Sequence, residues 1–397
     1  MDTTTDIIVA GTGPAGLISA LALAKSGFAV SLVGPPVATG DLRTTALMKP
    51  SLDVLAGFGI GEAIEAGAAP LRTMRIVDGT DRLVRSPTVT FRAAEIGEEL
   101  FGLNIPNAHL VSVLDRAVRA EKAIARVETL VERWLPGDDA ILAELGAGLA
   151  DDGTITARLA VAADGRNSPA RQAAGIEIAS RPTGQAALVL TFVHARPHHD
   201  ISTEFHTGHG PFTQVPLPGD RSSLVWVTTP QRAAELVEMP DAEISRAVED
   251  GMQSMLGRVS VEAGRQVYPL SSGMPRRFAA SRIALVGEAA HVFPPIGAQG
   301  LNLGIRDAEA LAATAAAHRT DPGSAAALSA YDRARRPDIL ARATAVNALN
   351  RSLLSDLLPA QLARSLGLGL LGSFAPLRAF FMREGLRTGG GFAGLAR

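Results

Sequence analysis

The stretch DIIVAGTGPAGLISALALAKSGFAVSLVGPP, residues 6–36, constrains the fold more than any other part of the chain. Residues 7–10 are apolar and predict a buried strand, and a glycine-rich turn follows at once. A helix-compatible segment then runs up to Gly27, and residues 30–33 predict a second strand. Together these segments predict a βαβ unit, which belongs in a parallel sheet.

The turn of this unit carries the pattern G-x-G-x-x-G at Gly11, Gly13 and Gly16. In such turns the first glycine permits the sharp bend, the second lets the backbone approach a pyrophosphate, and the third lets helix and strand pack closely. The free N–H groups at the helix N-terminus favour a bound anion. The glycine pattern alone is a weak signal, but its place between a strand and a helix favours dinucleotide binding over a merely structural turn.

One expected part of a dinucleotide site is missing. The second strand of such a unit usually ends in Asp or Glu, which binds the adenosine ribose, and this chain has Gly34 there, followed by two prolines. The ribose must therefore be held by another group. The nearest candidates are Asp41 and Arg43, which are otherwise ordinary charges of a loop.

Composition excludes several other classes of protein. The chain has 397 residues, 47% of them hydrophobic, which is enough for two or three subdomains. It has no cysteine, so a disulfide framework, a thiol nucleophile and a cysteine metal site are excluded. The net charge of -2 gives no reason to expect nucleic acid as a partner. We expect neither a secretory signal nor a membrane-spanning helix, because the start lacks a basic region and no long uninterrupted apolar run occurs.

The middle of the chain is rich in predicted strands. Residues 122–165 alternate polar and apolar side chains and predict a β-meander, which ends in VAADGRNSPAR. Residues 185–275 predict an antiparallel sheet in a second domain, inserted before the chain returns to the first domain at 281–287. A strand at 283–286, a turn dense in Pro and Gly, and a helix from residue 300 to about 318 follow.

Three motifs in this order carry a resemblance to a known family. They are G-T-G-P-A-G at 11–16, A-D-G-R-N-S at 163–168, and G-E-A-A-H-x-x-x-P-x-G-A-Q-G-x-N-x-G at 287–304. Together they resemble the class A FAD-dependent aromatic hydroxylases, the para-hydroxybenzoate hydroxylase type. The segments at 43–47, 101–110, 210–228, 330–338 and 377–386 look like the ubiquinone-biosynthesis hydroxylases of the UbiH/UbiF family. The resemblance spans nearly the whole chain.

The resemblance implies an α/β fold: a Rossmann-like FAD-binding domain with an inserted mixed or antiparallel β-sheet substrate domain, and C-terminal helices. The FAD-binding domain is expected at 1–74, 99–180 and 277–345, the substrate domain at 75–98 and 181–276, and the C-terminal helical segment at 346–397. It also implies the residues that bind FAD, which are Gly11, Gly13, Pro14, Ala15, Gly16, Arg43, Asn107, Asp164, Gly165, Gly287, Glu288, Pro295, Gly297, Ala298, Gln299, Gly300, Leu301 and Asn302.

The implied activity is that of an oxidoreductase. A flavoprotein monooxygenase of this family uses molecular oxygen, with NAD(P)H as the expected electron donor, and hydroxylates an aromatic ring through a flavin C4a-hydroperoxide. The expected substrate is a polyprenylated phenol in ubiquinone biosynthesis. Two alternatives stay open: a hydroxylase of a soluble aromatic substrate, and a non-catalytic scaffold member of a quinone-biosynthetic complex. The polarity of the substrate pocket would distinguish the first alternative.

Two residues depart from the family pattern at sugar-binding positions. Glu288 stands where the family usually has Asp, and Gly34 replaces the ribose-binding acid. Each lost charge-assisted hydrogen bond costs roughly 1.5–3 kcal/mol, so weak retention of FAD is a hypothesis for this chain.

No catalytic residue is assigned, because the flavin carries the chemistry. Two candidates are His291, which follows the flavin turn, and Tyr268 as a phenol in a proton relay. For His291, packing or an indirect hydrogen bond is an equal alternative. Histidines also gather at 194–209, but their spacing lacks a tetrahedral pattern, so no metal site is predicted.

Leucine and phenylalanine recur at helical spacing over residues 353–381, with arginines between them. One interpretation is a set of helices that caps the flavin domain. The other is a surface that contacts a membrane or a partner protein, since a prenylated phenol resides in the bilayer. We expect a cytoplasmic protein, with peripheral attachment to the inner membrane face under the second interpretation.

Overall fold

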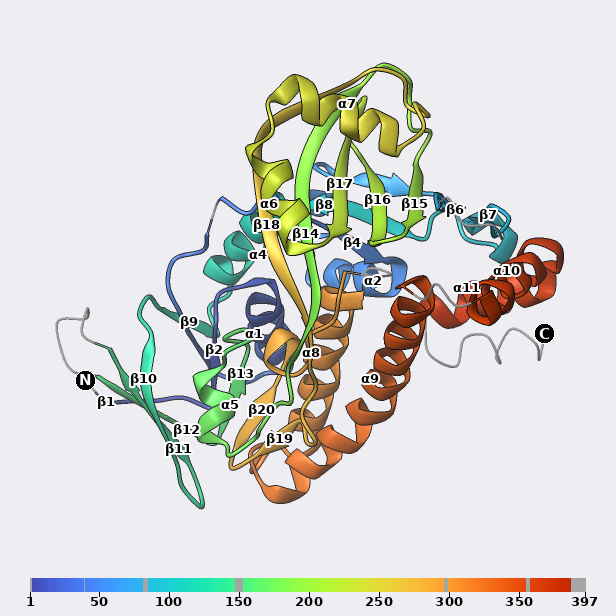
Figure 1. Ribbon diagram of the computed structural model, residues 1–397. Coiled ribbons are helices and arrows are strands. Elements are labelled where there is room, and N and C mark those ends of the chain that lie inside the picture. Colours follow the sequence, from blue (N-terminus) through green and yellow to red (C-terminus); the bar gives the residue numbers. More distant parts are fainter. Residues whose placement is uncertain are drawn as a thin grey trace.

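The computed structural model describes residues 2–38, 40–80, 85–146, 153–295, 299–354 and 358–386 (Figure 1). Its mixed α/β architecture confirms the predicted fold class. The strands are β1 Asp2–Thr4, β2 Ile7–Ala10, β3 Val30–Val33, β4 Thr44–Met48, β5 Ala69–Leu71, β6 Thr73–Asp78, β7 Val89–Arg92, β8 Gly102–Pro106, β9 Ile124–Val127, β10 Val131–Pro136, β11 Ile141–Leu145, β12 Thr154–Ala157, β13 Leu159–Ala162, β14 Arg181–His194, β15 Ile201–Thr207, β16 Gly210–Leu217, β17 Arg221–Thr228, β18 Val259–Ser272, β19 Ala279–Ala280 and β20 Ile283–Leu285. The helices are α1 Pro14–Lys25, α2 Lys49–Gly57, α3 Gly61–Glu65, η1 Ala93–Ile96, α4 Asn107–Ala120, α5 Pro169–Ala173, α6 Pro230–Glu238, α7 Asp241–Gly251, η2 Gly287–Ala289, α8 Gln299–Ala317, α9 Ala325–Leu354, α10 Leu358–Ser373 and α11 Ala375–Leu386.

A six-stranded sheet in the order β19-β20-β13-β2-β3-β9 forms the centre of the first domain. Strands β20, β13, β2, β3 and β9 run parallel to one another, and β19 joins β20 antiparallel. The predicted strands at 7–10 and 30–33 are confirmed, and every residue in both is buried. Uniform burial explains why these strands are apolar apart from Ser31, because a parallel sheet is covered on both faces.

Helix α1 follows β2 as predicted; it begins at Pro14, with Gly13 before it. Residues 16–24 are all buried, because α1 packs between the sheet and the neighbouring helices α8 and α4. It ends before Gly27, which has a left-handed φ of 83°. The first domain also includes a four-stranded sheet, β1-β12-β11-β10, and a three-stranded sheet, β4-β8-β5.

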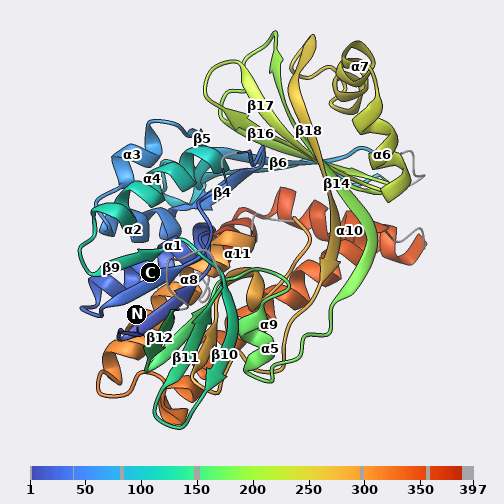
Figure 2. The same ribbon diagram turned by 90° about the vertical axis from the view of Figure 1, so that its left-hand side faces the viewer.

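The second large sheet has seven strands in the order β18-β14-β17-β16-β15-β6-β7. It is mixed, since β6 joins β15 in parallel while β14, β15, β16, β17 and β18 pair antiparallel. The sequence predicts only strands in 185–275, whereas α6 and α7 interrupt that run. Both are short amphipathic helices that bury single apolar stripes against the outer side of this sheet (Figures 1 and 2).

The opposite, inner face of the seven-stranded sheet lies toward the first domain. Ser223 Oγ is 2.9 Å from Thr44 Oγ1, and the Arg43 guanidinium lies 5.0 Å from the centre of the Tyr268 ring. We call the face that carries Ser223 and Tyr268 the inner face. Paired residues of neighbouring strands share a face, so strand register shows which other side chains belong to it.

The C-terminal helices follow the first domain. Helix α9 runs across residue 345, the predicted end of the FAD-binding domain, and the domain boundaries stay a prediction. Within the described residues, no single helix is long and apolar enough to cross a bilayer. One bent pair, Ser365–Ser373 with Ala375–Leu386, passes that test together, with an angle of 103° between its halves.

Candidate cofactor and substrate site

The three sequence motifs meet at the carboxyl ends of β2, β13 and β20, which are adjacent parallel strands. Gly11 follows β2 with φ at 114°, and a Cβ added there would lie 2.2 Å from the Ala163 carbonyl oxygen. Ala163 in turn begins the second motif, just after β13. The first two motifs are therefore in direct backbone contact, and only glycine allows it.

Within the first motif, a Cβ added to Gly16 would lie 1.9 Å from the Gly11 carbonyl oxygen. The third motif also packs closely on the first, because a Cβ added to Gly287 would lie 2.9 Å from Ala15 Cβ. Gly304 in α8 is also close to both Gly287 and Ala15. Small residues thus bring α1, η2 and α8 together around one point.

The N-termini of α1 and α8 both face open space at this point. A Cβ added to Gly13 or Gly300 would meet no atom of the described residues within 4 Å, and no side chain caps α1. The free N–H groups and the helix dipole of each terminus favour negative charge. The first terminus fits a pyrophosphate, and the second fits the ring edge of a flavin that becomes anionic on reduction.

Asp164 offers a free acceptor beside these helix ends. Its Oδ2 accepts from the Ala170 N–H at 3.1 Å and so caps α5. Its Oδ1 is buried and has no hydrogen-bond partner among the described residues. Burial raises the pKa of Asp164, and the Ser168 and Ala170 hydrogen bonds only partly oppose that effect. A buried acceptor without a donor fits a hydroxyl of a bound FAD, so the site suits the cofactor.

Arg171 joins the second motif to the third. It is 4% exposed, its Nη1 donates to the Ala289 carbonyl at 3.1 Å, and its Nη2 donates to the Arg166 carbonyl at 3.0 Å. Burial lowers the pKa of Arg171, and the charge of Asp164 opposes that effect. No role was predicted for Arg171 from the sequence. Its position just after A-D-G-R-N-S was the one signal that it belongs to the site.

The structure brings Arg43 and Asn107 together through Asp41. Arg43 pairs with Asp41 at 2.7 Å, and Asn107 Nδ2 donates to the same carboxylate at 2.8 Å. The Tyr268 ring stacks against the Arg43 guanidinium, and its hydroxyl donates to Gln266 Oε1. Asp41 therefore bonds both Arg43 and Asn107, and no described contact links it to Gly34.

Glu288 is exposed in η2, at the end of β20. The hydrogen bond that Arg43 donates to Asp41 raises the pKa of Arg43, and the negative charge of Glu288 raises it further. Glu288 thus presents a carboxylate on the side of the site where Arg43 lies. Burial raises the pKa of Tyr268, so its phenol holds its proton at neutral pH, and its role in a relay stays a prediction.

The place of the missing ribose-binding acid is filled by Thr12. A Cβ added to Gly34 would lie 2.8 Å from Thr12 Cγ2 and 3.2 Å from Thr12 N. The Thr12 hydroxyl donates to the Pro35 carbonyl at 2.7 Å, which fixes the side chain in that position. Gly34 and Thr12 are therefore a matched pair, and a side chain at residue 34 requires a smaller one at residue 12.

His291 lies in a buried ionic cluster. Its Nε2 is 2.7 Å from Asp307 Oδ2, and Arg335 Nε is 2.7 Å from Asp307 Oδ1. Asp307 also accepts from the Gly287 N–H at 3.1 Å and so fixes the turn that begins at Gly287. Burial acts to raise the pKa of Asp307, but His291 and Arg335 outweigh it, and the net pKa is lowered.

These contacts favour the indirect, positioning interpretation of His291, and its role stays a prediction. Its ring also stacks on Phe293 at 5.6 Å, and its Nδ1 has no partner among the described residues. Sequence reasoning missed Asp307 and Arg335. The available signal was that each is a charged residue on a helix; where such a residue is buried, its charge needs an ion-pair partner.

The remaining predicted FAD contacts lie at the start of α8. Pro295 precedes it, and Gln299, Gly300 and Leu301 form its first turn. The Asn302 side chain is engaged elsewhere: it accepts from Met48 N at 2.9 Å and from Ser51 Oγ at 2.7 Å. Contact from Asn302 to a flavin would therefore come from its backbone. Gly297 and Ala298 lie outside the described residues.

The histidine-rich segment 194–209 is divided between the two faces of the seven-stranded sheet. His194 bonds to Ser222 at 3.0 Å on the outer side, and His206 bonds to Glu204 at 2.9 Å on the inner face. In the part of the chain that the structure describes, no three His, Asp or Glu side chains gather closely enough to hold a metal ion.

The inner face of the sheet is apolar where it continues from Tyr268. Register places Ala187 beside Tyr268 and Val227, and Val189 beside Gln266 and Val225. The positions Ala187, Val189, Val225 and Val227 carry no charge and no hydrogen-bonding side chain. Ala187, Val189 and Val227 are buried, and Val225 is partly exposed, so Val225 is the one of these four positions open to an apolar ligand.

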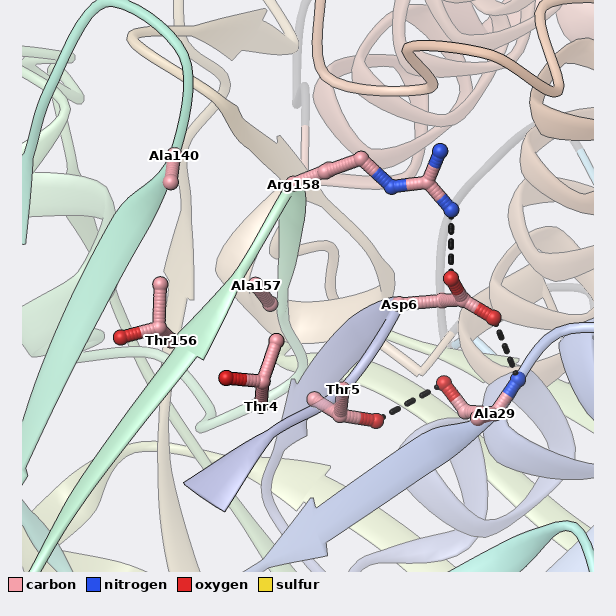
Figure 3. Close-up of a pocket in the computed structure, with 8 residues that line it drawn as sticks. All are labelled: Thr4, Thr5, Asp6, Ala29, Ala140, Thr156, Ala157 and Arg158. Atoms are coloured by element: carbon pink, nitrogen blue, oxygen red, sulfur yellow. Dashed lines mark hydrogen bonds and ion pairs between the residues drawn. The ribbon is translucent and has the colours of Figure 1, made fainter. Parts of the chain in front are cut away.

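A hollow of about 320 Å³ lies elsewhere, at the amino ends of β2 and β3 (Figure 3). It is lined by Thr4, Thr5, Asp6, Ala29, Ala140, Thr156, Ala157 and Arg158. Asp6 accepts from both Arg158 and the Ala29 N–H, so its carboxylate is already engaged. Ligands of such sheets bind at the carboxyl ends of the strands, where the three motifs meet, and this hollow is at the opposite end.

Comparison with known proteins agrees with this geometry. Residues 4–346 match the family described as FAD binding domain. The chain is 34% identical over 401 residues to the ubiquinone hydroxylase UbiL of Rhodospirillum rubrum, covering 98% of this chain and 90% of that protein. It is 32% identical over 316 residues to the 3-demethoxyubiquinol 3-hydroxylase of Escherichia coli, covering 77% and 78%. The crystal structure of p-nitrophenol 4-monooxygenase PnpA from Pseudomonas putida shares the fold, with a TM-score of 0.79, 21% identity and 97% of both chains covered.

Proposed function

We propose that this chain, which belongs to the FAD binding domain family of flavin-dependent hydroxylases, hydroxylates the aromatic ring of a polyprenylated phenol in ubiquinone biosynthesis. The expected co-substrates are molecular oxygen and NAD(P)H. When bound, FAD supplies the oxygen-activating chemistry, and the protein supplies binding, orientation and exclusion of water. The proposal rests on two relatives named for ubiquinone chemistry, one of which matches nearly the whole chain.

The residues present support FAD in defined places. The α1 N-terminus with Gly11, Gly13 and Gly16 would hold the pyrophosphate, and Asp164 Oδ1 would accept from a hydroxyl of the cofactor. The α8 N-terminus would face the flavin ring. A cofactor site with its glycine contacts and its free acceptor in place supports an enzyme over a non-catalytic scaffold.

The apolar inner face is the observation that favours a prenylated ring over a soluble aromatic acid. A soluble acid needs a cation or several donors at its carboxylate. The described positions Ala187, Val189, Val225 and Val227 supply neither. Ala187, Val189 and Val227 are buried, and Val225 is partly exposed, so Val225 offers apolar area that a prenyl chain can remove from water, worth about 25 cal/mol for each Å².

A direct test uses the purified protein loaded with FAD. Under anaerobic NADPH or NADH the flavin absorbance should bleach, and bleaching should accelerate when a 2-prenylphenol is present. Admission of heavy-isotope oxygen gas should then place one labelled oxygen on the aromatic ring, detected by mass spectrometry. Release of hydrogen peroxide without ring labelling for every prenylated phenol, together with labelled dihydroxybenzoate when 4-hydroxybenzoate is supplied, would favour the soluble-substrate alternative.

We also propose peripheral contact with the inner membrane face through the C-terminal helices. Large apolar side chains are exposed on α10, on α11 and at the break between them, namely Leu366 at 67%, Leu370 at 59%, Phe374 at 56% and Phe381 at 51%. Leu366 and Leu370 are four residues apart on one side of α10, and Phe374 follows at the break, where its N–H still donates to the Leu370 carbonyl at 2.9 Å. These helices lie at the periphery of the molecule (Figure 1). Of the segment 353–381 expected to form this surface, the side chains up to residue 364 lie outside the described residues.

Co-sedimentation with vesicles containing anionic lipid tests this contact. The triple variant Leu366→Ser, Leu370→Ser and Phe374→Ser should lose binding, because it removes the exposed apolar stripe. Leu130, which is 63% exposed on a distant turn, provides the matched control Leu130→Ser, which should bind like the unmodified protein. Equal sedimentation of the triple variant and the control would contradict the proposal.

A further inference from the structure

A polar pair stands at one end of the apolar inner face. Glu204 and His206 lie two residues apart on β15, and register places Glu204 beside Thr213 of β16, which in turn pairs with Val225. Both side chains therefore share the face that carries Ser223 and Tyr268. From the strand spacing and rise, Glu204 lies about 12 Å along the sheet from Ser223, where the sheet touches the first domain.

This pair is largely buried but incompletely bonded. The side chains of His206 and Glu204 are 5% and 18% exposed, and His206 Nε2 lies 2.9 Å from Glu204 Oε1. The other oxygen, Glu204 Oε2, has only a long contact of 3.4 Å from the Thr213 hydroxyl. An ionised carboxylate accepts about four hydrogen bonds, so Glu204 has capacity for another donor.

The other acids on the strands of the inner face are engaged with their own surroundings. Asp78, beside His206 on β6, accepts from Thr80 and from the Ser86 N–H. Glu262 accepts two hydrogen bonds from Arg221. Among the residues the structure describes, Glu204 is thus the acid on this face best placed to accept from a ligand that lies on the apolar positions beside it.

We propose that Glu204 accepts a hydrogen bond from the phenolic hydroxyl of the substrate, and that His206 positions Glu204 for it. The inference rests on the proposed function, because it takes a prenylated phenol as the ligand. The partly exposed Val225 would contact the ring and its prenyl chain, and the carboxylate beside it would fix the direction in which the hydroxyl points. A fixed hydroxyl determines which ring carbon faces the flavin, so Glu204 would be a residue that sets the position of hydroxylation.

The hydrogen bond predicts discrimination between a phenol and its methyl ether. The probes are 2-prenylphenol and 2-prenylanisole, which have the same ring and chain but differ in the single donor. Their dissociation constants are measured from the change in flavin absorbance of the FAD-loaded protein. A hydrogen bond to a charged acceptor is worth at least about ten-fold in affinity, so the unmodified protein should bind the phenol about ten-fold more tightly than the ether.

Three variants separate this role from a structural one. Glu204→Gln should bring the ratio of the two dissociation constants close to one, because an amide is a weaker acceptor than a carboxylate. His206→Gln should lower the ratio partly, since it removes the group that orients Glu204 and leaves the carboxylate in place. Glu262→Gln is the matched control, the same chemical change at an acid held by Arg221, and should leave the ratio unchanged.

Each outcome decides a separate point. A ratio near one in the unmodified protein, with both probes bound, would overturn the role of Glu204 and leave the proposed function standing. An unchanged ratio in Glu204→Gln would overturn it as well. If Glu204→Gln fails to retain FAD, an unchanged ratio in His206→Gln serves as the refuting result. Failure of the unmodified protein to bind either probe would count against the prenylated substrate itself.

Discussion

The pairing of Thr12 with Gly34 predicts a specific way to strengthen FAD binding. Gly34 ends the strand where related sites carry a ribose-binding acid, and its φ is not in the left-handed region, so a glutamate there is not excluded by the backbone. The obstacle is Thr12, whose Cγ2 would lie 2.8 Å from the new Cβ. The double variant Thr12→Ala with Gly34→Glu removes that obstacle and supplies the carboxylate.

The expected magnitudes differ between the variants. Gly34→Glu alone forces Thr12 to move, which costs about 1–3 kcal/mol for overpacking and about 1 kcal/mol for the hydrogen bond to the Pro35 carbonyl. The double variant avoids the overpacking, although the Thr12 N–H at 3.2 Å still requires a small adjustment. A charge-assisted hydrogen bond to the ribose then adds about 1.5–3 kcal/mol, which corresponds to roughly 10- to 150-fold tighter binding of FAD.

The assay is titration of the FAD-free protein with FAD, followed by the quenching of flavin fluorescence, with urea unfolding of the FAD-free proteins alongside. Thr12→Ala is the matched control, because it loses the hydroxyl without gaining an acid. We expect FAD affinity to rise in the order Gly34→Glu, Thr12→Ala, double variant. A double variant that binds FAD no more tightly than Thr12→Ala would refute the assignment of residue 34 to the ribose.

Three further predictions concern packing and charge in the first domain and the C-terminal helices. Asp307→Asn should lower the free energy of unfolding by about 1–3 kcal/mol at pH 7, because it removes the carboxylate that bonds buried His291 and one of the two carboxylates that pair with Arg335, which keeps Asp338 at 3.0 Å. The lowered pKa of Asp307 means that its contribution is present above the ordinary value of 3.8 and is lost as the pH falls through its folded pKa. The difference in urea stability between the unmodified protein and Asp307→Asn should therefore narrow below pH 3.8. A difference that stays constant until Asp307 is fully protonated would contradict this role of its charge. Gly16→Ala should abolish FAD binding, because its Cβ would lie 1.9 Å from the Gly11 carbonyl oxygen, and a fluorescence titration like that of the unmodified protein would contradict this. Arg378→Ala should weaken the attachment of α11 by about 1–3 kcal/mol, since Arg378 donates to Glu95 at 2.7 Å, and limited proteolysis of the FAD-loaded protein should then release the C-terminus faster; equal cleavage rates would argue against this anchor.

The sequence alone predicted the parts of the fold that repeat a local pattern. The strands at 7–10 and 30–33, the start of α1 and the helix after residue 299 were all predicted from apolar runs, proline and glycine. The glycines of the three motifs also predicted a common site, because close approach of backbone to backbone or to a cofactor requires them. The family assignment followed from the order and spacing of those same motifs.

Tertiary structure decided what depends on partners far apart in the chain. The burial of Asp307 between His291 and Arg335 joins a turn and two helices, and no local pattern specifies which charges will meet. The same holds for the contact between Thr12 and Gly34. These residues are 22 positions apart in the chain, and they meet only because β2 and β3 lie side by side. Glu204 likewise acquired its place only through the register of β15 with β16, because a shift of one residue would turn it to the outer face. Local propensity is encoded within a few residues, whereas pairing of buried charges and strand register is fixed by the packing of the whole chain.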